Sequence, residues 1–177
     1  MSGPTATVSA AIAAIFERDL RALRREVEAY PDERDLWRTV PGIANVAGTL
    51  VLHLTGNLQH YLGALWGGTG YRRDRPAEFS RREVTRAELL RQIEAARAAV
   101  QGAQPRLSQA ELTADFPEAV GGARIATLDY LIHLTTHFAY HLGQIDYHRR
   151  VVTGNDQGVG AMRPAELGSA RATGVDA

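Results

Sequence analysis

Apolar side chains recur at every third or fourth position in four separate stretches of the chain, which is the spacing of an amphipathic helix. The first stretch includes Phe16 and Val27 and ends before Pro31, where a helix cannot readily continue. No stretch of useful length alternates between polar and apolar residues, so the pattern predicts no β-strand of consequence. The expected helices cover residues 12–27, about 43–65, about 85–102 and about 125–152.

Two pairs of residues mark helix starts in the second half of the chain. Thr85 precedes Glu88 by three residues, the pattern of an N-terminal capping box that should open the third helix. Ser108 precedes Glu111 by the same interval and should open one short turn. Four long amphipathic helices favour a four-helix bundle, and the predicted fold class is therefore all-α.

The chain length is that of one domain. At 177 residues the protein is large enough to bury a hydrophobic core, and we expect the helical domain to cover residues 1–152. The remaining tail, residues 153–177, is rich in Gly, Ala and Ser. We expect this tail to be flexible or draped over the surface.

The charge balance excludes several classes of partner. Twenty Lys and Arg residues match twenty Asp and Glu residues, which leaves no electrostatic footprint for nucleic acid or an anionic membrane. The N-terminal stretch TATVSAAIAAIF lacks the basic region of a signal peptide, and no segment approaches the length of a membrane span. We therefore expect a cytoplasmic protein. Because the chain has no cysteine, any metal must be held by nitrogen and oxygen ligands.

Three of the six histidines follow one another at four-residue intervals in the stretch HLTTHFAYHLGQ. Positions four apart on an α-helix are offset by only about 40°, so His133, His137 and His141 share one strip of the fourth helix. Two imidazoles at this spacing can bind one divalent cation. The helix has no glutamate next to the first ligand, so a zinc-protease mechanism is not indicated.

The second helix supplies a further candidate ligand. His53 lies among Val51, Leu52 and Leu54, where a solvated histidine is out of place, and His60 follows on nearly the same face. Glycine inside a helix costs about 1 kcal/mol relative to alanine. Its repetition along one strip therefore indicates the close approach of another group, either a metal pocket or a tightly packed helix. The three glycines are Gly48, Gly56 and Gly63.

Spacing alone leaves two interpretations of these histidines open. They fit a metal site built from His53 and the pair on the fourth helix, and they equally fit hydrogen-bonded core residues. We interpret His60 and His133 as ordinary packing residues, and His148 as a complement to the C-terminal end of the helix dipole. The arginine-rich stretch YRRDRPAEF is interpreted as a solvated loop with local ion pairs rather than an anion-binding lid.

The stretches NVAGTLVLHLTGNLQHYLGALWGG and HLTTHFAYHLGQIDYHRR, in this order, resemble the DinB-like superfamily of small helical proteins. The similarity extends from the first helix to about Arg150. It implies a four-helix bundle of up-down-down-up topology with a metal site of three histidines, one from the second helix and two from the fourth. These positions correspond to His53, His137 and His141 here, while His133 lies outside the implied site.

The resemblance also implies an activity. Relatives with assigned chemistry are bacillithiol- or mycothiol-dependent S-transferases and a mycothiol-dependent maleylpyruvate isomerase. We accordingly expect a homodimeric enzyme that uses Zn²⁺ or Ni²⁺ to activate a low-molecular-weight thiol for transfer to an electrophilic small molecule. The alternative is a non-catalytic bundle that binds metal structurally or dimerises through its histidines. Near the end of the second helix, Tyr61, Trp66 and Phe79 fit either a substrate wall or an interaction patch.

Overall fold

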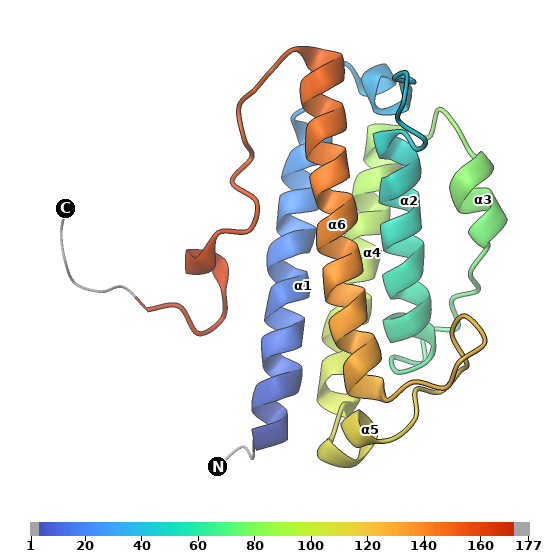
Figure 1. Cartoon of the computed structure of the whole chain (residues 1–177), viewed down its shortest axis with the longest axis vertical. Helices are drawn as coiled ribbons and strands as arrows, with labels where there is room; N and C mark the ends of the chain where they lie inside the picture. The colour runs from blue at the N-terminus through green and yellow to red at the C-terminus, as the bar shows by residue number, and fades with distance from the viewer. Residues whose placement is uncertain (1–3, 172–177) are drawn as a thin grey trace.

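Four long helices lie side by side along the length of the molecule (Figure 1). The structure is a computed structural model that describes residues 4–171. The described residues contain no strand, only two isolated bridges in the loop before the last long helix, so the all-α prediction is confirmed. The long helices are α1 (Pro4–Glu28), α2 (Ala47–Leu58, continued by the π-helical turn Gln59–Ala64), α4 (Arg86–Ala103) and α6 (Thr127–Thr153).

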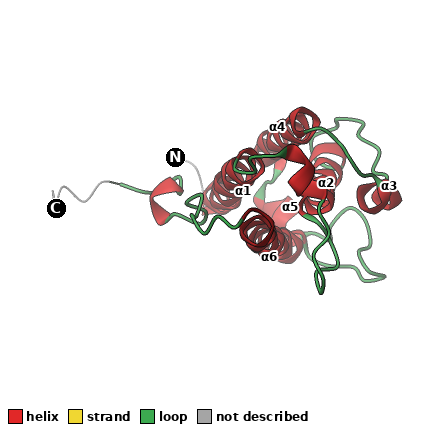
Figure 2. Ribbon diagram, turned by 90° about the horizontal axis from the view of Figure 1, so that it is seen from above, coloured by secondary structure: helices red, strands yellow, loops and turns green. Residues whose placement is uncertain are grey.

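The bundle has the expected up-down-down-up topology. In Figure 1, α1 and α6 run in one direction, whereas α2 and α4 run in the other. Helix α1 packs against α4 and α6, and α2 packs against the same two helices, so α1 and α2 occupy opposite corners of the bundle (Figure 2). Helices α2 and α6 are therefore antiparallel neighbours, which brings the two histidine-bearing segments together.

Side-chain caps form at the two helix starts for which the sequence predicted capping boxes. The Thr85 side chain accepts a hydrogen bond from the Glu88 backbone N–H at the start of α4, and Ser108 caps the short helix α5 (Gln109–Thr113) in the same way. The expected start of α2 at residue 43 was wrong. Gly42 has a φ of 82°, and Ile43 donates its N–H to the carbonyl of Val40, so a turn occupies this stretch.

Short helical segments connect the long ones. Helix α3 (Arg75–Ser80) was not predicted and lies beside α2 in the long connection to α4. Its first turn is capped by the Asp74 side chain, which accepts the N–H of Ala77. The remaining segments are the 3₁₀ turns Glu33–Trp37, Gln104–Arg106 and Pro164–Glu166.

The core fills the space between the four long helices. Each fully buried large apolar side chain contributes about 1.5–3 kcal/mol relative to an exposed one. Two glycines of α2 allow neighbouring groups to approach closely: a Cβ at Gly48 would overlap the ring of Trp37, and a Cβ at Gly63 would lie 3.0 Å from Ala99 of α4. Core residues with almost no exposure include Phe16, Leu20, Leu23, Leu50, Leu54, Leu58, Leu89, Ile93 and Phe138.

A buried ion pair joins α6 to α1. The Arg149 guanidinium lies 2.6 Å from Glu26 and 2.8 Å from Asp146, and its side chain is only 1% exposed. It also donates to the backbone carbonyl of Gln157, where the chain turns back after α6. Burial raises the pKa of Glu26 to about 7, and the hydrogen bond from Arg149 opposes this shift.

The segment after α6 is held against α1 by arginines. Arg25 donates to the carbonyls of Val159 and Gly160 and pairs with Glu166 at 3.2 Å. Arg21 lies 3.3 Å from the same carboxylate. No helix of the described residues is long and apolar enough to cross a membrane.

The Arg149 pair yields a stability prediction. We expect Arg149→Ala to lower the free energy of unfolding by about 3–5 kcal/mol, because it leaves the Glu26 carboxylate buried without its partner. The neighbouring Arg150→Ala removes a partly exposed ion pair with Asp146. This variant should change the free energy of unfolding by less than about 1 kcal/mol. Urea unfolding of both variants tests this, and equal effects would contradict the structural role given to Arg149.

Candidate metal centre

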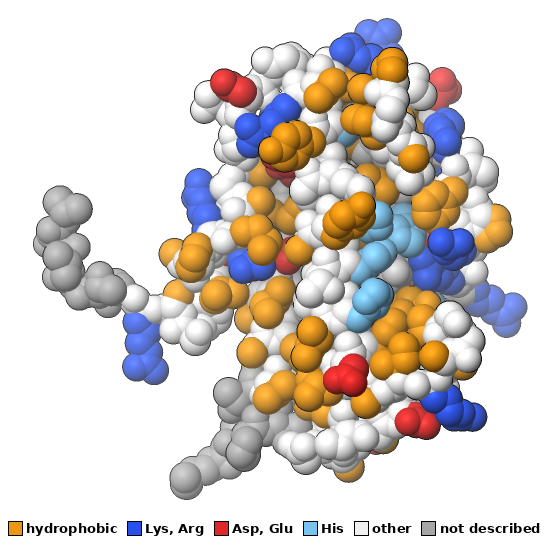
Figure 3. Space-filling view, viewed as in Figure 1, with side chains coloured by type: hydrophobic (Ala, Val, Ile, Leu, Met, Phe, Trp, Pro, Cys, Tyr) orange, Lys and Arg blue, Asp and Glu red, His pale blue; other side chains and the backbone are white. Residues whose placement is uncertain are grey.

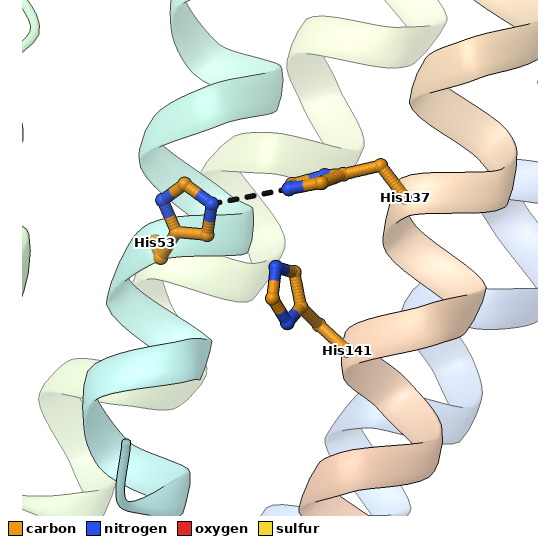
Figure 4. A group of neighbouring side chains, drawn as sticks. All are labelled: His53, His137 and His141. Atoms are coloured by element: carbon orange, nitrogen blue, oxygen red, sulfur yellow. Dashed lines mark hydrogen bonds between the residues drawn. The ribbon is translucent and has the colours of Figure 1, made fainter. Parts of the chain in front are cut away.

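Three histidine side chains converge between α2 and α6. His53 comes from the middle of α2, and His137 and His141 come from successive turns of α6 (Figure 4). One nitrogen from each ring lies within 4.8 Å of the nitrogens of the other two. The structure thus brings together the three residues that the sequence singled out and leaves His133 outside the group.

The spacing of the nitrogens suits a shared ion. The Nε2 atoms of His53 and His137 are 3.2 Å apart. Two nitrogens bound at about 2.05 Å to one tetrahedral ion would be separated by about 3.3 Å. The third nitrogen, from His141, lies within 4.8 Å of the other two. The donor set and its geometry therefore fit a divalent cation.

A carboxylate fixes the tautomer of His53. Its Nδ1 lies 3.0 Å from Oε2 of Glu78, and both side chains are almost fully buried. Arg73 holds the same carboxylate with contacts of 2.7 and 2.9 Å. Burial alone would raise the pKa of Glu78, but hydrogen bonds from His53 and Arg73 outweigh it and lower that pKa. Nδ1 of His53 therefore donates to an ionised carboxylate, and the lone pair of Nε2 faces the centre.

Burial favours the neutral form of the two histidines of α6. Burial lowers the pKa of His137 to about 4, and the neighbouring His141 and His53 rings add to this shift. Burial likewise lowers the pKa of His141, whose Nδ1 lies 2.6 Å from the side-chain oxygen of Gln144 one turn later. A hydrogen bond from Nδ1 to that oxygen leaves Nε2 of His141 as the donor atom for a cation.

The site opens on one face of the molecule. Figure 3 shows the histidine side chains as a continuous strip on the surface, bordered by apolar side chains and by arginine. The Phe79 ring lies against His53 with a centroid separation of 5.0 Å. Trp66, by contrast, is buried against Phe116, so it is not part of a surface patch.

The other histidines have separate roles. His133 is exposed and stacks on His137 with ring centroids 6.0 Å apart, so it lies at the surface rather than in the core. His60 lies 2.9 Å from Glu118 in the loop before α6. The interpretation of His148 as a dipole complement was wrong: it is fully buried, with Nδ1 2.8 Å from the Tyr30 hydroxyl and Nε2 2.9 Å from the Arg38 carbonyl oxygen. Burial also lowers its pKa, which disfavours the charge a dipole complement needs.

The arginine-rich stretch contributes more than a solvated loop. Arg72 and Arg75 are exposed, as the sequence led us to expect, but Arg73 and Glu78 turn inward and support His53. Sequence reasoning missed both residues. The available signal was Gly56, because a Cβ at this position would overlap the carboxylate of Glu78.

Comparison with known protein families agrees with this architecture. The profile of the DinB superfamily matches residues 15–145, a range that contains all three converging histidines. The chain belongs to the DinB superfamily. No curated protein matches it. The matched range covers most of α1, all of α2 and α4, and most of α6.

The buried position of His137 yields a pH prediction. In the metal-free DinB protein, the ring of His137 should titrate near pH 4 rather than near the usual 6.5, because burial disfavours its charged form. Protonation of this residue in the unfolded chain should therefore reduce folding stability as the pH falls from about 6.5 towards 4. Histidine ring NMR signals report the titration directly, and a His137 signal that moves near pH 6.5 would refute the prediction.

Proposed function

We propose that His53, His137 and His141 bind one divalent cation, Zn²⁺ or Ni²⁺, and that the protein is an enzyme that activates a low-molecular-weight thiol. The thiol would attack an electrophilic small molecule. The observation that carries this proposal is the convergence of three imidazole nitrogens, without a fourth ligating residue in the group found among the described residues. Three protein ligands leave a coordination position for water or substrate, as in catalytic zinc sites.

The chemistry follows from the donor set. A divalent cation at this site would lower the pKa of a thiol bound beside the histidines and supply a thiolate near neutral pH. The protein has no cysteine, so the sulfur must come from a small molecule. Glu78 and Arg73 would hold the His53 ring in its ligating orientation, and Gln144 would do the same for His141.

The alternative is a structural metal site in a non-catalytic bundle. Structural zinc sites are almost always closed by four protein ligands. The only carboxylate in contact with the three histidines among the residues described is Glu78, and it faces Nδ1 of His53, on the far side of that ring from His137. This arrangement favours the open, catalytic site over the closed one.

A thiol-transfer assay tests the activity. At pH 7 only about 3% of a thiol with a pKa of 8.5 is ionised, so full ionisation would raise its reactivity up to about 30-fold. Zinc-loaded protein should accelerate the attack of cysteine on a bromomethyl electrophile, in which a carbon–sulfur bond forms and bromide leaves. His137→Ala should abolish the acceleration. If the zinc-loaded protein and the metal-free protein gave the same reaction rate with a panel of low-molecular-weight thiols, the enzymatic proposal would fail.

The metal content of alanine variants distinguishes the proposed ligating histidines from the neighbouring His133. Alanine variants of His53, His137 and His141 should each purify without stoichiometric metal, because two remaining imidazoles hold a cation far more weakly than three. His133→Ala is the matched control on the same strip of α6 and should keep most of its metal. Elemental analysis gives the occupancy, and circular dichroism confirms that each variant is folded. Full occupancy in His53→Ala would exclude a site shared between α2 and α6.

We also propose that the protein is a cytoplasmic homodimer. The outer face of α6 exposes Ile132, Tyr140, Tyr147 and Val151 at helical spacing, and the zero net charge opposes association only weakly. Light scattering at micromolar concentration should give twice the 19.3 kDa of one chain. Tyr147→Glu should shift the mass towards the monomer, whereas Met162→Glu, on the segment after α6, should not. A monomer for the unaltered protein would contradict the proposal.

A further inference from the structure

Asn57 is a buried polar residue one helical turn from His53. Its side chain is 7% exposed, and its shielded Oδ1 accepts no hydrogen bond from any described residue. Buried polar atoms in proteins almost always have a hydrogen-bond partner. An unpaired amide beside a candidate metal centre is therefore a candidate contact for a bound small molecule.

The helix geometry points Asn57 towards α6. Residues 53, 57 and 61 follow one another at four-residue intervals. The first two lie in regular α-helix and are offset by only about 40°, whereas Tyr61 lies in the π-helical turn. The first of the three faces His137 of α6, and the last, Tyr61, faces Tyr130 of the same helix with ring centroids 5.1 Å apart. Asn57 lies between these two residues along α2.

Aromatic side chains extend the contact between α2 and α6 away from the metal centre. The Tyr130 ring stacks on His133 at 5.7 Å and 17°, and His133 stacks on His137 at 6.0 Å and 27°. On the other side, the Arg73 guanidinium lies 5.6 Å from the centroid of the Tyr61 ring. Because Arg73 is paired with Glu78, its charge is largely compensated. This part of the α2–α6 contact thus combines aromatic ring faces with one unpaired amide oxygen.

The backbone of α2 changes at this point. The π-helical turn Gln59–Ala64 begins two residues after Asn57, and within it Leu65 donates to the carbonyl of His60 five residues earlier. Single π-turns inside α-helices occur frequently at functional sites, where the wider turn redirects side chains. Here the π-turn contains Tyr61, the residue whose ring contacts Tyr130 of α6.

We propose that Asn57, Tyr61, Tyr130 and His133 form a second subsite, which binds a planar carboxamide group of the small molecule whose other end binds at the histidines. This inference rests on the proposed metal site and deepens it by naming a structural feature of the ligand. An amide side chain can both donate to and accept from such a group, and the aromatic rings pack on its flat face. Four residues of α-helix rise about 6 Å, which sets the distance between the two ends of the ligand.

Two ligand pairs test the subsite on the cobalt-loaded protein, whose visible spectrum reports binding at the metal. In the first pair, 3-mercaptopropionamide carries the amide and 3-methylbutane-1-thiol is its apolar isostere. We expect the amide to bind about 10-fold more tightly, the ratio of affinities that one or two hydrogen bonds supply. In Asn57→Leu the ratio should fall to about one, because the hydrogen-bonding groups are removed at nearly constant volume.

Thr49→Val is the matched control. Thr49 is also buried with an unpaired oxygen and also lies four residues from His53, but on the opposite side along the helix. This variant should keep the roughly 10-fold ratio. Tyr61→Leu should reduce the ratio and provides a second test if Asn57→Leu fails to fold, which circular dichroism reveals. An unchanged ratio in a folded Asn57→Leu or Tyr61→Leu variant, or an equal loss in Thr49→Val, would overturn the subsite.

The second ligand pair tests the subsite independently of thiol binding. Succinamate and 4-methylpentanoate bind metal through a carboxylate and differ in the same amide. An Asn57-dependent preference for succinamate without any spectral change from thiols would support the subsite and refute thiol activation. If thiols bind but neither amide ligand is preferred over its isostere, the subsite is wrong and thiol activation stands. Failure of cobalt to bind would refute the proposed metal site and the subsite with it.

Discussion

The antiparallel packing of α2 against α6 is the constraint on which the rest of the structure depends. Two histidines four residues apart on one helix offer only two nitrogens, so a third must come from a neighbouring helix in the correct register. Core residues such as Leu54 and Phe138 hold the bundle together, and the Arg149–Glu26 pair ties the far end of α6 to α1. With α6 held in this way, His53 faces His137 at 3.2 Å.

Burial and hydrogen bonding then prepare the three imidazoles for a cation. Desolvation favours the neutral form of His137 and His141, and the Glu78 carboxylate directs the Nδ1 proton of His53 away from the centre. A proton and a cation compete for the same nitrogen, so a depressed pKa also weakens the competing proton. The structure therefore favours metal ligation through Nε2 at neutral pH without requiring a charged histidine in the interior.

The sequence predicted those features that repeat along a helix. Periodicity identified four long helices, capping boxes located the start of α4, and four-residue spacing placed His137 and His141 on one strip. The support of His53 by Glu78 was not predictable in this way, because α3 is too short to show periodicity and the contact joins residues 25 positions apart. His148 was misinterpreted for a similar reason, since its partners Tyr30 and Arg38 come from distant parts of the chain.

X-ray absorption spectroscopy of the nickel- or zinc-loaded protein tests the central claim most directly, because it reports the atoms bound to the metal. The account predicts three imidazole nitrogens at about 2.0–2.1 Å together with one or more exchangeable light-atom ligands. Addition of a small thiol should replace such a ligand with one sulfur at about 2.3 Å. A first shell with fewer than three imidazoles, or one closed by four protein ligands that excludes the thiol, would contradict it.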